Sequence, residues 1–366
     1  MFSGSIRERV VLYSRGWRRS AMSADVTSST GLQELLSPRV VRSTVLPFIQ
    51  QQVSALDPTH LARICRYHLG FADEHGEPSS GGVGKLTRAS LMTAVADGVG
   101  LRPEDVRSQA AAVELLHNAT LLHDDIADDD ELRRGRPAAW KVFGTSLAIH
   151  AGNALQALGL RMVVDDSGPG HNEIAGSFTE ALALVHAGQA RELSLRPEPA
   201  GIAVYEHMVM EKASALLEWS LGTPAIRAGR PEKDVAVLRE AGRHLGIALQ
   251  ISNDVEDIWG DPALTGKPIR GDIKRRNLTF PVLVSLSADN AAGDQLGRLW
   301  QEDNTTTDHL QALADLIDEA GGRHTAERLS RDHLDSAVEN LGRAGLSPTA
   351  TAELTILFDR IVNRAV

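Results

Sequence analysis

The segment LLHDDIADDDELRRGRP, residues 121–137, places six acidic side chains in eight consecutive positions and follows them with three arginines. Carboxylates on adjacent turns of a helix repel one another, so the segment needs solvent, salt or a bound cation among its acids. The residues from 108 to 128 have helical periodicity, and His117, Asp124 and Asp128 fall on one face of that helix. The segment therefore predicts a long helix with an acidic end.

Helical periodicity continues on both sides of this segment, from about residue 33 to the C-terminus, and strand patterns are nearly absent. A second long helix is predicted over 238–261. Joints rich in Gly, Pro and Asp separate the helices, at 73–82, 100–105, 133–137, 165–170, 195–201, 227–234 and 260–272. Long helices around one core predict an all-α fold, a large single-domain helical bundle whose facing side chains build the functional site.

The composition is that of a globular chain that can bury a large core, with 366 residues, 42% hydrophobic and 23% charged. The net charge of -10 and the lack of a basic stripe argue against nucleic acid as a partner. The single cysteine, Cys65, allows no internal disulfide and favours a cytoplasmic location. No apolar run approaches the length of a membrane span, so we expect none.

The N-terminal 32 residues differ from the rest of the chain. The first 22 are rich in Arg and Ser and contain one acid, which is typical of a transit peptide. The other interpretation is a dispensable tail, or an upstream start ahead of Met22, and we favour it. We therefore expect a variable extension over 1–32 and one domain over 33–366.

The acids at 124 and 128 are one helical turn apart, an arrangement that suits a hard divalent cation. Mg2+ takes carboxylate oxygens from such positions and keeps others for water and phosphate oxygens. Arg133 and Arg134 can bind phosphate through bidentate guanidinium contacts, so acids and arginines together indicate a diphosphate site. The alternative is a solvated acidic helix end, which is the usual fate of a charge run.

A second acidic run, NDVEDIWGD, occupies residues 253–261 of the second long helix. Asn253, Asp257 and Asp261 are four residues apart and would share one helical face. Two such runs facing each other across a bundle can hold several cations, with a diphosphate as the bridging ligand.

At these residues the chain resembles the trans-isoprenyl diphosphate synthases of the polyprenyl synthetase family, and it is similar to geranylgeranyl diphosphate synthases. The motif DDxxDxxxxRRGxP is matched in full by residues 124–137, and the motif QxxDDxxD by residues 250–257 with one departure at Asn253. The resemblance covers about residue 40 to the C-terminus. It implies the isoprenoid synthase fold with a central active-site cavity, three Mg2+ ions and a homodimer.

The resemblance also implies roles for individual residues. The implied metal ligands are Asp124, Asp128, Asn253, Asp254 and Asp257. The implied catalytic residues are Asp124, Asp125, Asp128, Arg133, Lys212 and Lys267. Isopentenyl diphosphate would be bound by Lys85, Arg88, His117 and Arg134. The allylic diphosphate would be bound by Arg133, Lys212 and Lys267, and Gln250 is a further substrate-binding residue. Asn277 stands where the family stretch DLxxGKxTLP has its lysine, with Arg276 beside it.

The implied reaction is ionisation of an allylic diphosphate followed by attack of the isopentenyl diphosphate double bond, with the released diphosphate taking the proton. No side chain need act as a nucleophile. The growing apolar chain would lie along the first acidic helix, where Ala119 and Thr120 precede the motif by about one turn. Their small size suggests a deep pocket and a product of about twenty carbons, from a helical rise of ~1.5 Å per residue.

Two other functions compete with elongation. A class I terpene cyclase ionises the same substrates with a motif of the form NDxx[ST]xxxE, and the Asn253 departure resembles it. A cyclase has no need of isopentenyl diphosphate, however, and Lys85, Arg88, His117 and Arg134 are all present. A regulatory subunit of a hetero-oligomeric synthase would tend to lose the first metal motif, which is whole here. We therefore favour elongation.

Overall fold

The computed structural model describes residues 39–79, 83–195, 201–262 and 269–363. The expected extension over 1–32 and Lys267, which was predicted to bind the allylic diphosphate, lie outside these residues. The first half of the described chain forms α3 (Arg39–Ser54), α4 (Thr59–His68), α5 (Thr87–Gly98), η1 (Pro103–Val106), α6 (Arg107–Ala127), β1 (Leu132–Arg133), β2 (Arg136–Pro137), α7 (Ala139–Phe143), α8 (Thr145–Val164) and α9 (His171–Ser194). The second half forms α10 (Ile202–Val209), η2 (Met210–Ser214), α11 (Ala215–Arg227), α12 (Glu232–Trp259), α14 (Gly271–Arg275), α15 (Phe280–Leu286), α16 (Ala291–Trp300), α17 (Thr307–Glu319), α18 (Gly322–Arg343) and α19 (Pro348–Val362).

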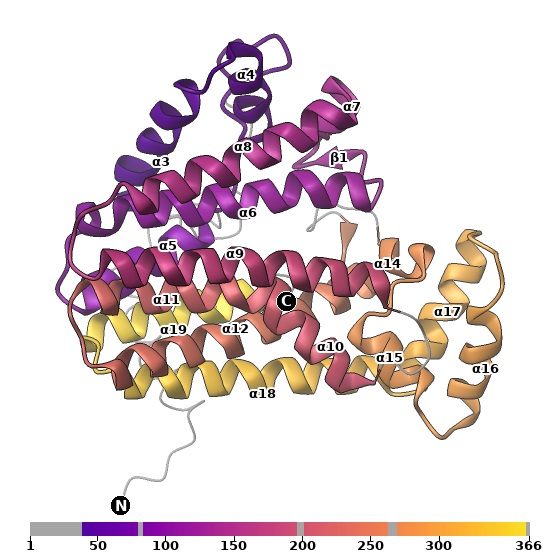
Figure 1. Ribbon diagram of the computed structural model, residues 1–366. Helices are drawn as coiled ribbons and strands as arrows, with labels where there is room; N and C mark the ends of the chain where they lie inside the picture. Colours follow the sequence, from indigo (N-terminus) through magenta and orange to yellow (C-terminus); the bar gives the residue numbers. More distant parts are fainter. Residues whose placement is uncertain (1–38, 80–82, 196–200, 263–268, 364–366) are drawn as a thin grey trace, which may run out of the picture.

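The long helices α6, α8, α9, α12 and α18 lie side by side, with α3, α4 and α7 at one edge and α14 to α17 at one end (Figure 1). Helix α6 packs along α8 and α5, while α12 packs along α11 and α18. The described residues are overwhelmingly helical, and their strands are limited to one two-stranded hairpin. The predicted all-α bundle is confirmed. The central cavity between the acidic helices stays a prediction.

Helix α6 is the central helix, because its sequence is apolar and small all round. Four consecutive residues, Ala110 to Val113, have no exposed surface. Such a helix is stable only when it is covered on every side, and α3, α5, α8 and α11 cover it. It ends at Ala127, one residue before the predicted end. The acidic segment therefore leaves the core at the end of a helix that is covered on several sides.

Helix α12 begins directly after Pro231, and Glu232 and Asp234 in its first turn favour the positive end of the helix dipole. It ends at Trp259, because Gly260 adopts extended backbone angles. The predicted helix over 238–261 is therefore displaced toward the N-terminus. Asp261 lies beyond its end, so the prediction that it shares a helical face with Asn253 and Asp257 is wrong.

The segment RRGRP, expected to be a simple joint, forms the hairpin β1–β2, in which Arg133 pairs with Arg136. Arg134 and Gly135 make the two-residue loop and both have positive φ, 53° and 73°. Two-residue loops of this kind match the twist of the flanking strands, at the cost of an unfavourable backbone for Arg134. The hairpin fixes where the two arginines of the motif point.

Helix α8 was not expected to resemble a membrane span, yet it is the one helix of the described chain long and apolar enough to cross a membrane. Length and composition are weak criteria here, since a core helix of a bundle meets them too. Helix α8 packs along α6 and also contacts α4, α7 and α9. Of the most apolar 18-residue stretch of α8, 44% is buried inside the protein, which is consistent with a helix that packs in a bundle.

Candidate active site

The acidic end of α6 faces a lysine of η2 and a glutamate of α9. Lys212 forms an ion pair with Glu192 and interacts electrostatically with Asp124 and Asp128. Burial raises the pKa of Asp124 to about 6, with Lys212 opposing the rise and Asp128 adding to it. Burial also raises the pKa of Asp128. Two acids and one lysine predicted from the sequence therefore meet here.

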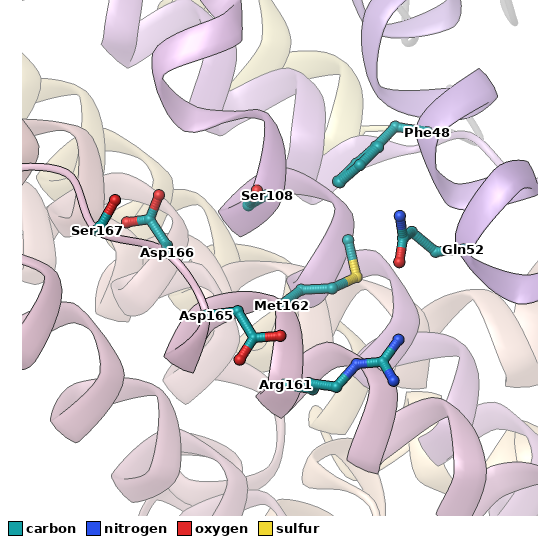
Figure 2. Close-up of a pocket in the computed structure, with 8 residues that line it drawn as sticks. All are labelled: Phe48, Gln52, Ser108, Arg161, Met162, Asp165, Asp166 and Ser167. Atoms are coloured by element: carbon teal, nitrogen blue, oxygen red, sulfur yellow. The ribbon is translucent and has the colours of Figure 1, made fainter. Parts of the chain in front are cut away.

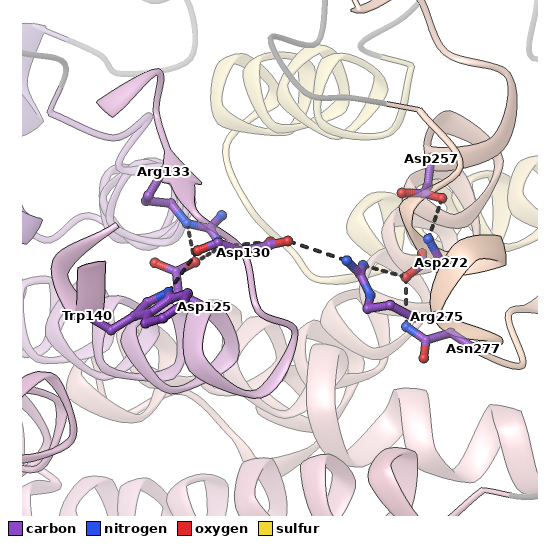
Figure 3. A network of polar contacts seen from close by, with 8 residues as sticks. All are labelled: Asp125, Asp130, Arg133, Trp140, Asp257, Asp272, Arg275 and Asn277. Carbon is purple, nitrogen blue, oxygen red and sulfur yellow. Dashed lines mark hydrogen bonds and ion pairs between the residues drawn. The ribbon is translucent and has the colours of Figure 1, made fainter. Parts of the chain in front are cut away.

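The middle acid of the first motif has a different place from its neighbours. Asp125 is 1% exposed and accepts hydrogen bonds from Arg133, whose Nε lies 2.7 Å from Asp125 Oδ1 (Figure 3). Arg133 also lies 3.7 Å from Asp130. Because one oxygen of its carboxylate accepts two hydrogen bonds from this arginine, Asp125 orients Arg133.

Arg134 has different partners from Arg133. Its guanidinium donates to Asn118 Oδ1 at 3.0 Å and to the His68 carbonyl at 3.2 Å. Burial and the adjacent Arg133 lower the pKa of Arg134. Nε2 of His68 is buried and has no hydrogen-bond partner among the described residues. The arrangement leaves excess positive charge in a buried place, which an anion would stabilise.

Two further predicted residues belong to the Arg134 cluster. Burial, then Arg88, then Arg134 lower the pKa of His117 well below its ordinary value. The buried Glu114 interacts electrostatically with both arginines and accepts the Ala89 N–H at 2.9 Å. Glu114 was not predicted from the sequence. Its position one turn before His117, on the same face of α6, is the signal that could have found it.

Lys85 follows Gly84, which lies against the Arg134 guanidinium. A Cβ atom on Gly84 would stand 2.7 Å from Arg134 Nη2. The next residue, Leu86, has a positive φ of 51° directly before α5, so the loop carries an unfavourable backbone conformation. The structure thus brings Arg88, His117 and Arg134 together and places Lys85 at the edge of their cluster.

Lys212 lies on a short π-helical turn, η2, between α10 and α11. Such turns are rare and are frequent at functional sites. Helix α9 approaches the turn closely, because a Cβ atom on Gly188 would stand 2.5 Å from the Lys212 backbone nitrogen. The absence of a side chain at 188 therefore lets Glu192 and Lys212 meet.

The structure gives Asp254 and Gln250 places that differ from those predicted. Asp254 is 3% exposed, and its carboxylate accepts hydrogen bonds from Tyr205 Oη at 2.6 Å, Phe280 N at 3.0 Å and Gln250 Nε2 at 2.9 Å. Burial raises the pKa of Asp254 to about 7, and the Tyr205 hydrogen bond opposes the rise. Three donors already fill its oxygens, so Asp254 is suited to holding α12 on α10 and α15, and Gln250 to holding Asp254.

Asp257 lies one turn after Asn253, and both are partly exposed. The Asp257 carboxylate accepts the backbone N–H of Asp272 at 3.0 Å, which ties α12 to the start of α14. Asn277 donates to Asp272 Oδ1 at 2.9 Å. Each of these two acids therefore accepts a hydrogen bond from an uncharged donor.

An arginine that sequence reasoning missed connects the two sides. Arg275 lies 3.0 Å from Asp272 and 3.4 Å from Asp130, which follows the first motif (Figure 3). Trp140 holds the backbone at Asp130 in place, since its Nε1 donates to the Asp130 carbonyl at 2.9 Å. From the sequence, only Asn277 and the adjacent Arg276 were considered in this stretch, because the surroundings of an exposed helix end cannot be derived from spacing.

The donor set fits Mg2+ bound together with a diphosphate. No three His, Cys, Asp or Glu side chains converge on one metal position in the part of the chain that the structure describes. Mg2+ is usually held by one or two carboxylates, with water and phosphate oxygens as its other ligands. Burial and mutual repulsion penalise charge on Asp124 and Asp128, and a divalent cation would relieve both.

The two residues expected to set chain length lie on α6 just before the acids. Ala119 is fully buried, and Thr120 Oγ1 donates to the His117 carbonyl at 2.7 Å. A separate surface hollow is lined by residues of α3, the start of α6, the end of α8 and the segment that follows α8 (Figure 2). The sixteen residues from Ser108 in that hollow to Asp124 span roughly 24 Å at ~1.5 Å each. The hollow is therefore remote from the acids.

The sequence and the fold are similar to those of known proteins. A family model described as polyprenyl synthetase matches residues 77–317. The chain is 34% identical over 327 residues to the (2E,6E)-farnesyl diphosphate synthase of Mycobacterium tuberculosis (strain ATCC 25618 / H37Rv), covering 87% of this chain and 90% of that protein. It is 35% identical over 296 residues to the geranylgeranyl diphosphate synthase of the same strain, covering 80% and 84%. A crystal structure of a polyprenyl synthetase from Streptomyces coelicolor A3(2) has a TM-score of 0.82 at 33% identity, covering 89% of this chain and 98% of that chain.

Proposed function

Because this chain belongs to the polyprenyl synthetase family and is a trans-prenyltransferase, we propose that it condenses an allylic diphosphate with isopentenyl diphosphate to give geranylgeranyl diphosphate. The allylic C–O bond breaks and diphosphate leaves with the electron pair. The isopentenyl double bond forms the new C–C bond, and the departing diphosphate removes the proton.

The observation that carries the proposal is the presence of two cationic clusters beside one helix. Arg133 and Lys212 lie by the acids of α6, where a metal-bound diphosphate would sit. Arg88, His117 and Arg134 form the second cluster around the preceding turns of α6. An enzyme that joins two diphosphate substrates needs two such sites, whereas a cyclase needs one.

The residues of the first cluster would act on the leaving group. Asp124, Asp128 and Asp257, with Asn253, would hold Mg2+ ions, three by analogy with the family. Bound Mg2+ would supply Lewis-acid stabilisation of the charge that develops on the leaving diphosphate. Arg133, fixed by Asp125, and Lys212, fixed by Glu192, add preorganised positive charge to the same group. Lys267 remains in the proposal from its sequence alone.

The second cluster would bind isopentenyl diphosphate. His68 and His117 have lowered pKa values, so near neutral pH their imidazoles are uncharged. The charge for the second diphosphate then comes from Lys85, Arg88 and Arg134. Glu114 and Asn118 position Arg88 and Arg134 without contacting substrate.

The product length is proposed from the pocket wall. Ala119 and Thr120 have small side chains where a bulky one would stop the growing chain early. The relatives are named farnesyl and geranylgeranyl diphosphate synthases. The small side chains at 119 and 120 support the longer of these two products. The cyclase alternative is not favoured, because a cyclase binds no isopentenyl diphosphate and would not need the second cationic cluster. A regulatory subunit is not favoured either, since Asp124 and Asp128 are retained.

The domain and assembly expectations are part of this proposal. One catalytic domain would span 33–366, with residues 1–32 as an extension. Leu147 and Ile149 of α8 and Leu184 of α9 are exposed aliphatic side chains on neighbouring helices, and they support a homodimer formed through these helices. Burial raises the pKa of the Cys65 thiol to about 12, so the lone cysteine is unreactive, in keeping with a cytoplasmic enzyme.

The decisive experiment incubates the purified protein and Mg2+ with geranyl or farnesyl diphosphate, with and without isopentenyl diphosphate. We expect longer diphosphates only when isopentenyl diphosphate is present, ending at twenty carbons. A hydrocarbon or alcohol formed without isopentenyl diphosphate would instead establish a cyclase. Replacing Ala119 with Phe should shorten the product, which tests the assignment of the pocket wall.

A further inference from the structure

Two adjacent arginines at the end of α14 have opposite surroundings. Arg276 donates to three backbone carbonyls, those of Ile273 at 3.0 Å, Glu302 at 2.6 Å and Asn304 at 3.2 Å. Its guanidinium also lies over the Trp300 ring. These neutral partners show that Arg276 fastens α14 to the segment after α16.

Arg275 instead contacts carboxylates on both sides of the candidate site. Nη2 lies 3.0 Å from Asp272 Oδ1, and Nη1 lies 3.4 Å from Asp130 Oδ1 (Figure 3). Asp128, a proposed Mg2+ ligand, is also close enough to raise the pKa of Arg275 against the effect of its burial. The guanidinium therefore lies where the two acidic segments and a metal-bound diphosphate would meet.

The contacts of Arg275 are of a kind that can be exchanged. The side chains of Arg275 and Asp130 are 33% and 32% exposed, and ion pairs with this much solvent contribute little to stability. A diphosphate offers a guanidinium two parallel charge-assisted hydrogen bonds, which are stronger. With Mg2+ on the neighbouring acids, the phosphate oxygens become the better partner.

We propose that Arg275 is a diphosphate-binding residue of the allylic subsite, exchanging its bonds to Asp130 and Asp272 for phosphate oxygens of the allylic substrate. This inference rests on the proposed function, since it names a further residue of that same site. Position 277 supplies an internal test. Asn277 Nδ2 reaches the same Asp272 oxygen as Arg275, at 2.9 Å, so a lysine at 277 would bring an ammonium group to that place.

The test titrates an S-thiolo analogue of farnesyl diphosphate, which does not ionise, into the full-length protein with Mg2+, using calorimetry. We expect Arg275→Ala to weaken analogue binding at least tenfold and to leave the affinity for isopentenyl diphosphate within about twofold. Arg275→Lys should be intermediate. The double variant Arg275→Ala with Asn277→Lys should recover most of the lost affinity. Lys274→Ala removes the adjacent exposed cation and should change the affinity for neither the analogue nor isopentenyl diphosphate.

A merely structural bridge between the two segments is distinguished by Asp130→Asn, which removes the carboxylate charge from the bridge and keeps the arginine. We expect that variant to bind the analogue as tightly as the wild type. An equal loss in Asp130→Asn and Arg275→Ala, an unchanged Arg275→Ala, or a double variant no better than Arg275→Ala would overturn the assignment. If the wild type binds the analogue but extends no allylic diphosphate, the proposed function fails and the assignment of Arg275 is still decided by the binding data.

Discussion

Neighbouring side chains of one type have different tasks in this site. Asp124 faces Lys212, whereas Asp125 turns inward and holds Arg133. Arg133 and Arg134 separate in the same way on the hairpin. Residue type and spacing predict that these acids and arginines lie at the site. The local backbone determines which residue of each adjacent pair faces the ligand.

The raised pKa of Asp124 makes Mg2+ binding dependent on pH. Its pKa is about 6, so the carboxyl is ionised at pH 7.5 and largely protonated at pH 5.5. Mg2+ requires the ionised form, so its affinity should fall as the pH drops through 6, by up to tenfold per pH unit, with proton release on binding near pH 6. Calorimetry in two buffers of different protonation enthalpy measures that release. Asp129→Asn changes the neighbouring exposed acid and should leave the proton release on Mg2+ binding unchanged. Loss of the proton release in that variant would contradict the role of Asp124.

The hydrogen bond from Tyr205 to Asp254 should have a pH-dependent effect on stability. This bond favours the ionised carboxylate and opposes the pKa rise caused by burial. Its contribution is therefore present above the Asp254 pKa of about 7 and is lost as the pH falls below it. Tyr205→Phe should cost about 1.5–3 kcal/mol at pH 8 and less at pH 5, measured by urea unfolding. Tyr67→Phe removes a hydroxyl that donates to the neutral Pro137 carbonyl at 2.7 Å, so its cost should not follow this titration. Parallel pH profiles for the two variants would refute the explanation.

Among the elements, the turn η2 and helix α9 set the position of Lys212. The turn departs from α-helical hydrogen bonding, and α9 can approach it because residue 188 is glycine. Neither feature touches the proposed substrate, but both determine where the ammonium group lies relative to the acids of α6.

Replacing Gly188 with Ala should therefore impair activity more than stability. The added Cβ would meet the Lys212 backbone 2.5 Å away, and backbone atoms must move to relieve that contact. We expect kcat to fall about tenfold, in line with the sensitivity of catalysis to small displacements. Gly176→Ala is the matched control in the same helix, because no atom lies within 4 Å of its added Cβ. It should keep full activity and gain about 0.5–1 kcal/mol. Equal activity of the two variants would show that the close approach at 188 is unimportant.

The sequence predicted the fold class and the extent of α6 closely, because apolar periodicity and small residues leave a central helix no alternative. Spacing placed Asp124 and Asp128 on one helical face, and the resemblance to the family implied that Lys212 belongs with them. The sequence could not show that Asp254 is filled by three donors, since these come from α10, α15 and α12 itself. Arg275 was missed for the same reason, because its partner Asp130 is 145 residues away in the chain.

At the scale of the whole molecule, the described chain has two groups of buried residues. The larger surrounds α6 and α8, and the smaller surrounds α15 to α17 together with Tyr205 of α10. Helix α12 contributes to both, and the acidic run at its end lies where it meets the smaller group. Helix α3, which begins at Arg39, completes the larger group by burying Val41, Val45, Ile49 and Val53.

Truncation should separate the extension from the domain. A protein that begins at residue 33 should keep the melting temperature and kcat of the full chain. A protein that begins at residue 55 loses the four buried aliphatic side chains of α3, at ~1.5–3 kcal/mol each, or roughly 6–12 kcal/mol in all. That loss is comparable to the whole stability of a typical domain, so the protein should not fold. Circular dichroism and thermal melting check both; a folded second truncation would show that α3 is dispensable.

The hairpin at 132–137 carries a consequence for how this chain can change over evolutionary time. Arg133 ends one strand and Arg134 belongs to the two-residue loop, in which both residues have positive φ, so an insertion or deletion of one residue here would change the loop and move both arginine side chains away from their partners. Each subsite would lose one of its cations in a single event. Alignment gaps among related chains should accordingly fall in the loops after α8 and α11, and not within these six residues.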